Sequence, residues 1–192
     1  MNAEEVIANF KDAGALLEGH FQLSSGLHST VYLQCALVLQ YPEHAEAFGR
    51  AIAQKFEGQG IRLVVSPAIG GIVIGHEVAR ALGARFIWTE REAGEMTLRR
   101  GFTVTPGEKA LVVEDVITTG GSTRETIDAV RKVGADVVAA ASIIDRSGGS
   151  ADVGVPLVSL ASLTVLSVES EVCDACKLGE PVVKPGSRAQ KS

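Results

Sequence analysis

The sequence predicts an α/β fold in which a doubly wound parallel sheet is flanked by helices. Apolar runs at residues 110–113 and 137–144, the second with Ser142 as its one polar residue, are short, as expected for strands buried on both faces. A strand, a glycine-containing loop and a helix also follow one another twice, over residues 61–82 and 109–134. The chain has 192 residues, 46% of them hydrophobic, which suits one domain with a full core. We therefore expect a single domain over residues 1–192.

Charge and hydropathy exclude several classes of protein. A formal net charge of −5 argues against a nucleic-acid partner, because nucleic-acid-binding faces are basic. No apolar run approaches the roughly 18 residues of a membrane span. The acidic start, Met1–Glu5, does not have the pattern of a signal peptide. We expect a cytoplasmic protein without a membrane anchor.

The first elements are predicted to be a helix and two short strands. Asn2 suits a helix N-cap, and two glutamates in the first turn complement the helix dipole. The helix is expected to end near residues 18–19, with one apolar face formed by Val6, Ile7, Phe10 and Leu17. Residues 20–34 alternate loosely and break at Ser25–Gly26, which predicts two strands around a turn.

The next unit contains a helix, a strand and a second helix. Pro42 suits the first position of a helix that ends near Gly58, with an inward face of Ala45, Phe48, Ile52 and Phe56. A strand at residues 61–66 and a helix at 72–82 enclose the loop Pro67–Gly71. The glycines of this loop either bind an anion through free amides or merely permit close packing, and the sequence favours neither reading.

A third strand at residues 85–89 leads into a polar segment at 90–101. The segment has almost no apolar pattern, which is typical of a solvated connection. A dozen residues are long for a passive link between core strands, and long loops near binding sites are often lids. We predict a mobile lid over about residues 90–101.

The central stretch, residues 109–134, is predicted to bind a phosphate. Its strand ends in the acid pair, Glu114 and Asp115, and a run of hydroxyl residues and glycines follows at 118–123. Backbone amides in such a run can approach an anion closely. A helix is expected from near residue 123, where Ser122 and Glu125 have capping-box spacing. Its orphan amides and dipole favour an anion in the loop.

Carboxylates beside a phosphate loop indicate a sugar phosphate. Carboxylates repel a bare phosphate but accept hydrogen bonds from ring hydroxyls. Alternatively, Asp115 only ends a strand and residues 118–121 form an ordinary turn. That reading is favoured for any single residue but not for the whole block. The chain has neither a Gly-Lys-Ser/Thr phosphate loop nor a Gly-x-Gly-x-x-Gly fingerprint.

The apolar strand at residues 137–144 delivers Asp145 and Arg146 to the edge of the sheet where ligands collect. A guanidinium offers a planar fork that matches a carboxylate. The alternative is a salt bridge between Arg146 and Asp145 or another acid. Residues 156–168 are expected to add one or two edge strands, and the chain from Gly179 is expected to be irregular.

The three cysteines are Cys35, Cys173 and Cys176. An odd number without a secretion signal makes a disulfide framework improbable. The Cys-x-x-Cys pair is open to three readings: incidental cysteines, a redox pair or half of a metal site. A zinc site needs four ligands, and no second Cys or His pair lies nearby at metal-ligand spacing. We favour incidental cysteines and assign no metal ligand.

Residues 112–123 resemble the phosphoribosyl diphosphate signature of type I phosphoribosyltransferases, a specific motif of about a dozen positions. The wider stretch from Leu16 to Arg146 is similar to orotate phosphoribosyltransferases of the shorter bacterial form. The resemblance implies the type I fold and transfer of phosphoribose to orotate, giving orotidine 5'-monophosphate for pyrimidine biosynthesis. It also implies Mg²⁺ as a cofactor and a homodimer with lids exchanged between subunits.

The resemblance also implies roles for individual residues. Catalytic roles fall on Arg91, Glu114 and Asp115, and orotate binding falls on Thr118 and Arg146. Phosphoribosyl diphosphate would contact Glu114, Asp115, Val116, Ile117, Thr118, Thr119, Gly120, Gly121 and Ser122. A small N-terminal hood, residues 18–40, would cover the pyrimidine, with its pocket shaped by Ser25, Gly26 and Tyr32.

Four positions depart from the family pattern. Ser24 and Gly70 stand where many members have a lysine, and the lid has Gly94 and Met96 where members have a lysine and a histidine. The positive charge of the lid is therefore expected from Arg91, Arg99 and Arg100. A purine phosphoribosyltransferase and a non-catalytic regulator that binds phosphoribosyl diphosphate are the alternative functions, and a redox protein is the third class.

Overall fold

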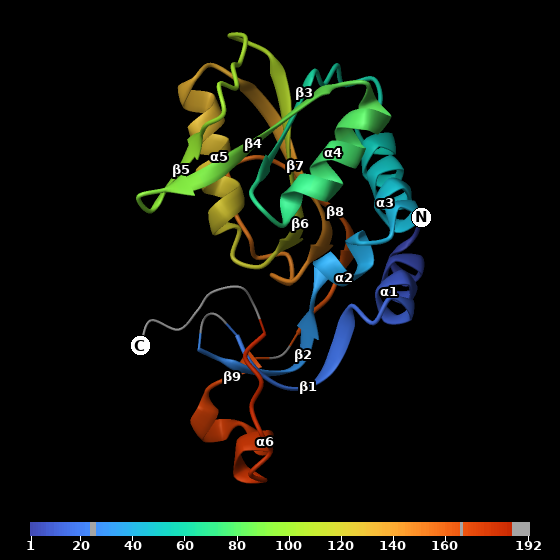
Figure 1. The fold of residues 1–192 in the computed structure, drawn as a ribbon, viewed down its shortest axis with the longest axis vertical. Coiled ribbons are helices and arrows are strands. Elements are labelled where there is room, and N and C mark those ends of the chain that lie inside the picture. The colour runs from blue at the N-terminus through green and yellow to red at the C-terminus, as the bar shows by residue number, and fades with distance from the viewer. Residues whose placement is uncertain (24–25, 166, 186–192) are drawn as a thin grey trace.

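The computed structural model of the protein describes residues 1–23, 26–165 and 167–185. Figure 1 shows a large α/β body and a small sheet below it. The helices are α1 (Ala3–Asp12), α2 (Cys35–Leu39), α3 (Pro42–Gln54), α4 (Gly71–Leu82), α5 (Gly121–Lys132), the 3-10 turn η1 (Ser170–Val172) and α6 (Asp174–Lys177). Among the described residues, no helix is both long and apolar enough to cross a membrane.

The main sheet contains six strands in the order β5-β4-β3-β6-β7-β8. Its strands are β3 (Leu63–Pro67), β4 (Arg85–Glu92), β5 (Glu95–Leu98), β6 (Lys109–Ile117), β7 (Asp136–Asp145) and β8 (Leu157–Ser162). All neighbours run parallel except β4 and β5. The helices α3 and α4 lie on one side of this sheet and α5 on the other (Figure 1). The predicted doubly wound α/β fold is confirmed.

The core forms two layers, one on each face of the main sheet. Val64 and Leu111 belong to the layer beneath α3 and α4, whereas Val65, Val112 and Ile127 belong to the layer beneath α5. Successive strand residues point to opposite faces. Both faces are covered, so the strands are apolar throughout rather than alternating.

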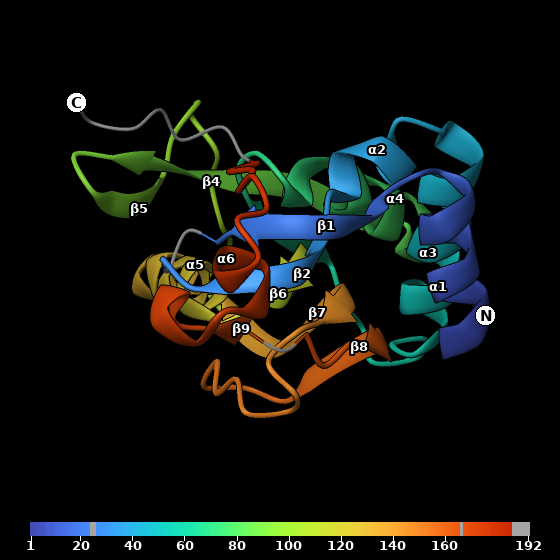
Figure 2. The same ribbon diagram turned by 90° about the horizontal axis from the view of Figure 1, so that it is seen from below.

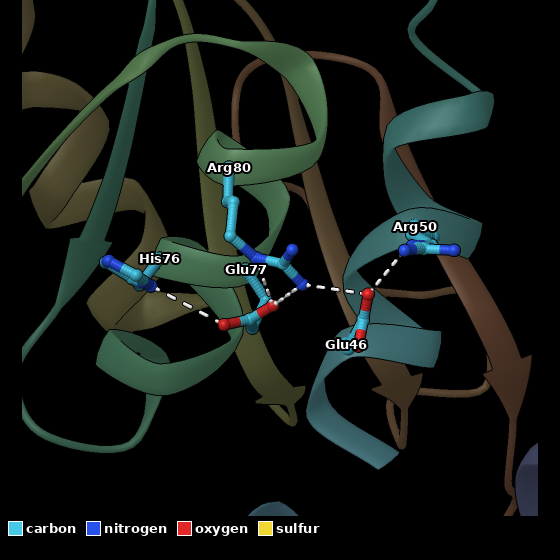
Figure 3. A network of polar contacts seen from close by, with 5 residues as sticks. All are labelled: Glu46, Arg50, His76, Glu77 and Arg80. Carbon is cyan, nitrogen blue, oxygen red and sulfur yellow. Dashed lines mark hydrogen bonds and ion pairs between the residues drawn. The ribbon is translucent and has the colours of Figure 1, made fainter. Parts of the chain in front are cut away.

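Close packing of α3 on α4 supports one face of the sheet. Gly49 of α3 lies against Glu77 of α4, where a Cβ atom would come within 2.6 Å of the Glu77 Cβ. Above this contact, Arg80 bridges its own helix and α3 by ion pairs to Glu77 (2.6 Å) and Glu46 (3.2 Å), as Figure 3 shows. These exposed pairs contribute little individually. The close contact of Gly49 with the Cβ and backbone of Glu77 therefore determines the spacing of the two helices.

The small sheet contains β1 (Leu16–Gln22), β2 (His28–Leu33) and β9 (Ser167–Val168). Its strands come from both ends of the chain. Beyond β9, the chain passes through α6 and returns to β1, where the Gln22 amide donates to Val183 O (2.9 Å) and the Val183 amide donates to His20 O (2.8 Å). Figure 2 shows α6 beside β1 and β2.

The first helix ends earlier than the sequence predicts. Asn2 is the N-cap, with the full capping box to Glu5, but α1 ends at Asp12 rather than near residue 18. Gly14 has a φ of 63°, a left-handed conformation that favours glycine and turns the chain out of the helix. Leu17 consequently pairs with Tyr32 in the small sheet instead of facing the core from a helix.

Residues 90–98 of the segment expected as a loop at 90–101 instead lie in a hairpin formed by β4 and β5. β4 continues to Glu92, turns at Ala93–Gly94 and returns as β5, with Arg91 opposite Met96. Both turn residues have positive φ, 50° and 94°. The polar pattern misled the prediction because the hairpin is only partly buried: Met96, Thr97 and Leu98 are half-buried and Leu98 packs against the core, whereas Glu92 and Glu95 are exposed.

Candidate functional site

The candidate site lies at the carboxyl ends of β3, β6 and β7 in the main sheet. β6 carries the acid pair and leads into Thr118 and Thr119, which are both exposed. Gly120 follows with a φ of 76°, and a Cβ there would come within 2.8 Å of Val153 Cγ1. Glycine is therefore required at this position both for its conformation and for space.

The helix α5 begins directly after this loop. Its N-cap is Gly120 and no side chain caps it. The predicted capping box at Ser122 and Glu125 is wrong, because Glu125 forms an ion pair with Arg91 instead. The first amides of a helix have no acceptor within it. Uncapped amides beside the exposed hydroxyls of Thr118, Thr119 and Ser122 make a site suited to a phosphate.

The loop before α4 packs directly on the acid pair. A Cβ on Gly70 would lie 2.9 Å from Asp115 Oδ2, and one on Gly71 would lie 3.0 Å from Glu114 Oε1. Any side chain at these two positions would displace a carboxylate. Gly70 and Gly71 therefore have a packing role, and anion binding by the amides of this loop stays untested.

The acid pair combines a buried Glu114 with a half-buried Asp115, and the two carboxylates repel each other. Glu114 is only 8% exposed. Burial, and then the charge of Asp115, raise the pKa of Glu114 well above its ordinary value. Burial also raises the pKa of Asp115, although hydrogen bonds from the Glu114 carboxyl and the Val116 amide partly offset this shift. The pair therefore holds a proton more tightly than free carboxyls do, and a bound cation or hydroxyl would relieve the repulsion.

Cys35 of α2 lies beside the acid pair. Burial raises the pKa of its thiol well above the ordinary value, and the charges of Asp115 and Glu114 raise it further. A buried, protonated thiol of this kind is unreactive, so Cys35 has a packing role at the site.

Arg146 follows β7 and lies between the main sheet and the small sheet. Its Nε is buried and, within the described part of the chain, has no hydrogen-bond partner. Burial lowers the pKa of Arg146, while its attraction to Tyr32 and Cys35 acts in the opposite sense. The alternative pairing with Asp145 does not form, since that carboxylate accepts from the amides of Ser147 (2.7 Å) and Gly149 (3.2 Å).

The three arginines of the predicted lid are paired with acids. Arg91 binds Glu125 and also donates to Gly94 O (2.5 Å). Arg99 lies 3.4 Å from Glu92, and Arg100 donates to Glu90 over 2.7 Å. In this conformation Arg99 and Arg100 are paired with acids of their own segment, whereas Arg91 is paired with the helix that begins at the phosphate loop.

Sequence reasoning missed a second cluster of chemically competent side chains. The His–Cys cluster contains His20 of β1, His28 of β2, and Cys173 and Cys176 at α6, whose nearest ligand atoms all lie within 4.8 Å of one another. The sequence signal was the Cys-x-x-Cys pair together with a histidine on each strand of a hairpin. The two halves are about 150 residues apart, so local spacing did not reveal them.

Comparison with known proteins places this arrangement in a family. Residues 37–169 match the phosphoribosyl transferase domain. The orotate phosphoribosyltransferase of Pelotomaculum thermopropionicum is 54% identical over 188 residues, 98% of this chain and 99% of that protein. That of Caldicellulosiruptor bescii is 55% identical with the same coverage.

Solved structures show the same fold. The crystal structure of orotate phosphoribosyltransferase from Aeropyrum pernix superposes with a TM-score of 0.67 at 28% identity, covering 82% of this chain and 93% of that one. The Mycobacterium tuberculosis enzyme in complex with 5-phospho-α-D-ribosyl 1-diphosphate has a TM-score of 0.66 at 23% identity, covering 83% and 96%.

Proposed function

The chain belongs to the orotate phosphoribosyltransferase family, and from this membership we infer the reaction of its main-sheet site. The site transfers the 5-phosphoribosyl group from 5-phospho-α-D-ribose 1-diphosphate to orotate. The products are orotidine 5'-monophosphate and diphosphate, in pyrimidine biosynthesis. The observation that carries the choice of orotate over a purine is Arg146, whose buried Nε lacks a partner in the described chain.

The phosphoribosyl half of the substrate is proposed to bind along the end of β6 and the start of α5. The 5-phosphate is held by the amides and hydroxyls of Thr118, Thr119, Gly120, Gly121 and Ser122. Val116 and Ile117 supply backbone at the floor of the site. The carboxylates of Glu114 and Asp115 accept hydrogen bonds from the ribose hydroxyls, which would compensate their burial.

Orotate is proposed to bind between the main sheet and the small sheet. The Arg146 guanidinium binds the orotate carboxylate as a planar fork, and Thr118 contacts the pyrimidine. Tyr32 lies close to Arg146: the guanidinium charge lowers the pKa of Tyr32, which partly offsets the larger rise that burial causes. Of the other residues proposed to shape this pocket, Ser25 lies outside the described residues, as does Ser24.

The reaction requires charge stabilisation rather than a strong base. The anion formed when orotate N1 loses its proton is resonance-stabilised, so no strong base is needed: N1 bonds to C1 of the sugar while its proton passes to the departing diphosphate or to water. The bond from C1 to the diphosphate oxygen breaks while the sugar becomes oxocarbenium-like. The acid pair fixes the ring hydroxyls, and an arginine of the hairpin stabilises the departing diphosphate. Closure of the hairpin would exclude water.

Mg²⁺ is the proposed cofactor, and the acid pair fits it. Magnesium binds one or two carboxylates together with substrate phosphates, and Glu114 and Asp115 present a buried and a half-buried carboxylate next to the phosphate loop. When bound, the ion neutralises charge on the diphosphate.

Arg91 is proposed as the catalytic residue of the hairpin. Its pairing with Glu125 keeps it beside the start of α5, and exchange of that partner for the diphosphate would bring its charge to the leaving group. Arg91→Ala should lower kcat about a hundred- to a thousandfold. Glu125→Gln distinguishes a catalytic Arg91 from one that only forms the ion pair with Glu125. If the ion pair is purely structural, Arg91→Ala and Glu125→Gln should lower kcat equally. Turnover of Arg91→Ala at the wild-type rate would remove the assignment.

We further propose a cytoplasmic homodimer in which the hairpin of one subunit serves the site of its partner. The hairpin projects from the main sheet, as Figure 1 shows for β4 and β5, and is therefore available to a second subunit. Mixing Arg91→Ala with Asp115→Asn subunits tests this arrangement. Recovery of activity in the mixed dimers supports a hairpin shared between subunits. If subunits demonstrably exchange but activity does not recover, the arrangement is contradicted.

The activity itself is tested by following orotate consumption spectrophotometrically with phosphoribosyl diphosphate and Mg²⁺. A parallel panel with adenine and hypoxanthine distinguishes a purine phosphoribosyltransferase. Saturable binding of phosphoribosyl diphosphate without turnover of any base would instead identify a regulator. Of the three bases, only orotate is expected to be consumed, with release of diphosphate.

A further inference from the structure

The His–Cys cluster has the geometry of a four-ligand metal site. His20 Nε2 lies 3.5 Å from the sulfur atoms of both Cys173 and Cys176, and His28 Nδ1 lies 3.2 Å from Cys176. Bonds of about 2.3 Å to sulfur and 2.0–2.1 Å to nitrogen place these atoms about 3.6 Å apart around a tetrahedral zinc ion. The two histidine nitrogens are closer, at 2.7 Å, and would move apart by about 0.6 Å around a tetrahedral ion.

The protonation of His20 is fixed by a backbone contact. Its Nδ1 lies 3.0 Å from Glu180 O, and a carbonyl oxygen can only accept, so Nδ1 carries the proton. Nε2 therefore presents a lone pair to the centre of the cluster. A histidine that binds a metal through one nitrogen usually donates from the other to a carbonyl or carboxylate.

Local strand geometry brings His20 into the cluster. The β1–β2 register shifts between Glu18 and Phe21, and His20 and Phe21 are both buried although adjacent strand residues normally face opposite ways. This bulge turns the His20 ring toward His28 and α6, as bulges commonly re-aim a side chain. His20 is 6% exposed and His28 is 5% exposed.

The two cysteines are free thiols rather than a disulfide, and Cys173 is 6% exposed. Two thiolates and two imidazoles in a tetrahedral arrangement favour zinc over magnesium or calcium, which prefer oxygen ligands. All four ligands come from the protein, so the site has no open position for a substrate. Closed sites of this kind are structural.

We propose that His20, His28, Cys173 and Cys176 bind one structural zinc ion that fastens α6 to the small sheet. The ion replaces the reading of Cys173 and Cys176 as incidental cysteines. It joins β1 and β2, the strand that contains Tyr32, to the C-terminal segment. In that segment η1 and α6 bury no residue of their own. The main sheet and its acid pair are not part of this site.

The first test is the zinc content of the full chain, purified without an affinity tag or chelator and measured by mass spectrometry. One zinc per chain is expected in the wild type. Cys173→Ser, Cys176→Ser and His28→Asn should each lose the bound zinc. Cys35→Ser and His76→Asn are matched controls that change a cysteine and a histidine outside the cluster, and they should retain it.

Cobalt exchange tests the ligand set independently of activity. Co²⁺ in the wild-type site should give the absorption of a tetrahedral ion and thiolate-to-cobalt charge-transfer bands, and both should be absent from Cys176→Ser. Should the serine variants fail to fold, a mercurial titration of the wild type decides, since zinc should be released as two thiols react. A metal-free wild type would overturn the proposal, whether its Cys173 and Cys176 are free thiols or a disulfide. Orotate turnover is measured separately, so failure of this site is distinguishable from failure of the proposed function.

Discussion

The main-sheet site and the His–Cys cluster are assembled from the chain in opposite ways. The phosphate loop, the acid pair and the helix start are contiguous within β6 and α5. The His–Cys cluster joins residues 153 and 156 positions apart. A local site leaves a pattern in the sequence, whereas a site formed by long-range contacts leaves only scattered residues. The difference explains why one was predicted and the other was missed.

The two regions also differ in what stabilises them. The main sheet has an apolar layer on both faces, and residues such as Leu111, Val112 and Ile143 are fully buried. In α6 and η1, by contrast, no residue is buried. Segments that bury little apolar surface usually need a disulfide or a metal to stay folded. The proposed zinc therefore lies where the hydrophobic contribution is smallest.

The largest effect is expected from Asp115→Asn in the main-sheet site. The change keeps the shape of the side chain but removes the charge that fixes a ribose hydroxyl, so kcat should fall about a hundred- to a thousandfold. Steady-state assays of orotate consumption measure this fall. Zinc content should stay at the wild-type level, because the cluster is independent of the acid pair.

Asp128→Asn, on the exposed side of α5, is the matched control and should retain wild-type turnover. Unchanged turnover in Asp115→Asn would contradict the role of the acid pair. Loss of zinc in the same variant would contradict the separation of the two regions.

Much of the main sheet could be predicted because its signals are local. The strands near residues 63–67 and 136–145, the helix that ends at residue 82 and the order of strand, acids, loop and helix all follow from short apolar runs and glycines. Arg146 was predicted as a ligand-binding residue, and the structure places it at the sheet edge with an unpaired Nε among the described residues. That role is still a prediction.

The sequence could not show which partner a polar residue would choose. Glu125 fits a capping box by spacing, but Arg91 lies within reach and pairs with it instead. Leu17 fits the apolar face of a helix, yet pairing with Tyr32 in the small sheet includes it in β1. In both cases a contact with a distant segment overrides the local preference.

The second prediction concerns the junction of the two regions. Arg146→Gln removes a charge-assisted pair to the orotate carboxylate, worth about 1.5–3 kcal/mol, so KM for orotate should rise about ten- to a hundredfold. KM for phosphoribosyl diphosphate should change little. Arg146→Lys keeps the charge without the planar fork and should lie between wild type and Arg146→Gln. An equal rise in both KM values would show that Arg146 only maintains the fold.

The third prediction concerns stability of the large body alone. Gly49→Ala would place a Cβ 2.6 Å from Glu77 Cβ and 2.8 Å from its carbonyl carbon, so α3 and α4 must separate. Overpacking of this kind should lower the free energy of unfolding by about 1–3 kcal/mol, measured by urea denaturation. Arg50→Ala, the next residue of α3, removes only the exposed pair in Figure 3 and should cost less than about 1 kcal/mol. Equal effects of the two changes would contradict the packing argument.

The smallest effect is expected on the pH dependence of stability. The His–Cys cluster and the acid pair should change the free energy of unfolding in opposite directions. Zinc binding to the His–Cys cluster should stabilise the fold, whereas burial of Glu114 beside Asp115 opposes it. Because the folded pKa of Glu114 is raised, its favourable contribution is complete below the unfolded value of about 4.3 and is lost as pH rises through the folded pKa.

Glu114→Gln remains neutral at every pH and removes this loss. The variant should therefore be more stable than wild type at neutral and alkaline pH, within the roughly 0.5–2 kcal/mol typical of single stabilising changes. The gain should shrink as pH falls toward about 4.3, where wild-type Glu114 is also protonated in the unfolded chain. Urea denaturation at several pH values measures it, with the exposed Glu57→Gln as a control that should show no such trend. A gain that grows at low pH would mean that Glu114 is stabilised as an anion, and would reverse the sign assigned to the acid pair.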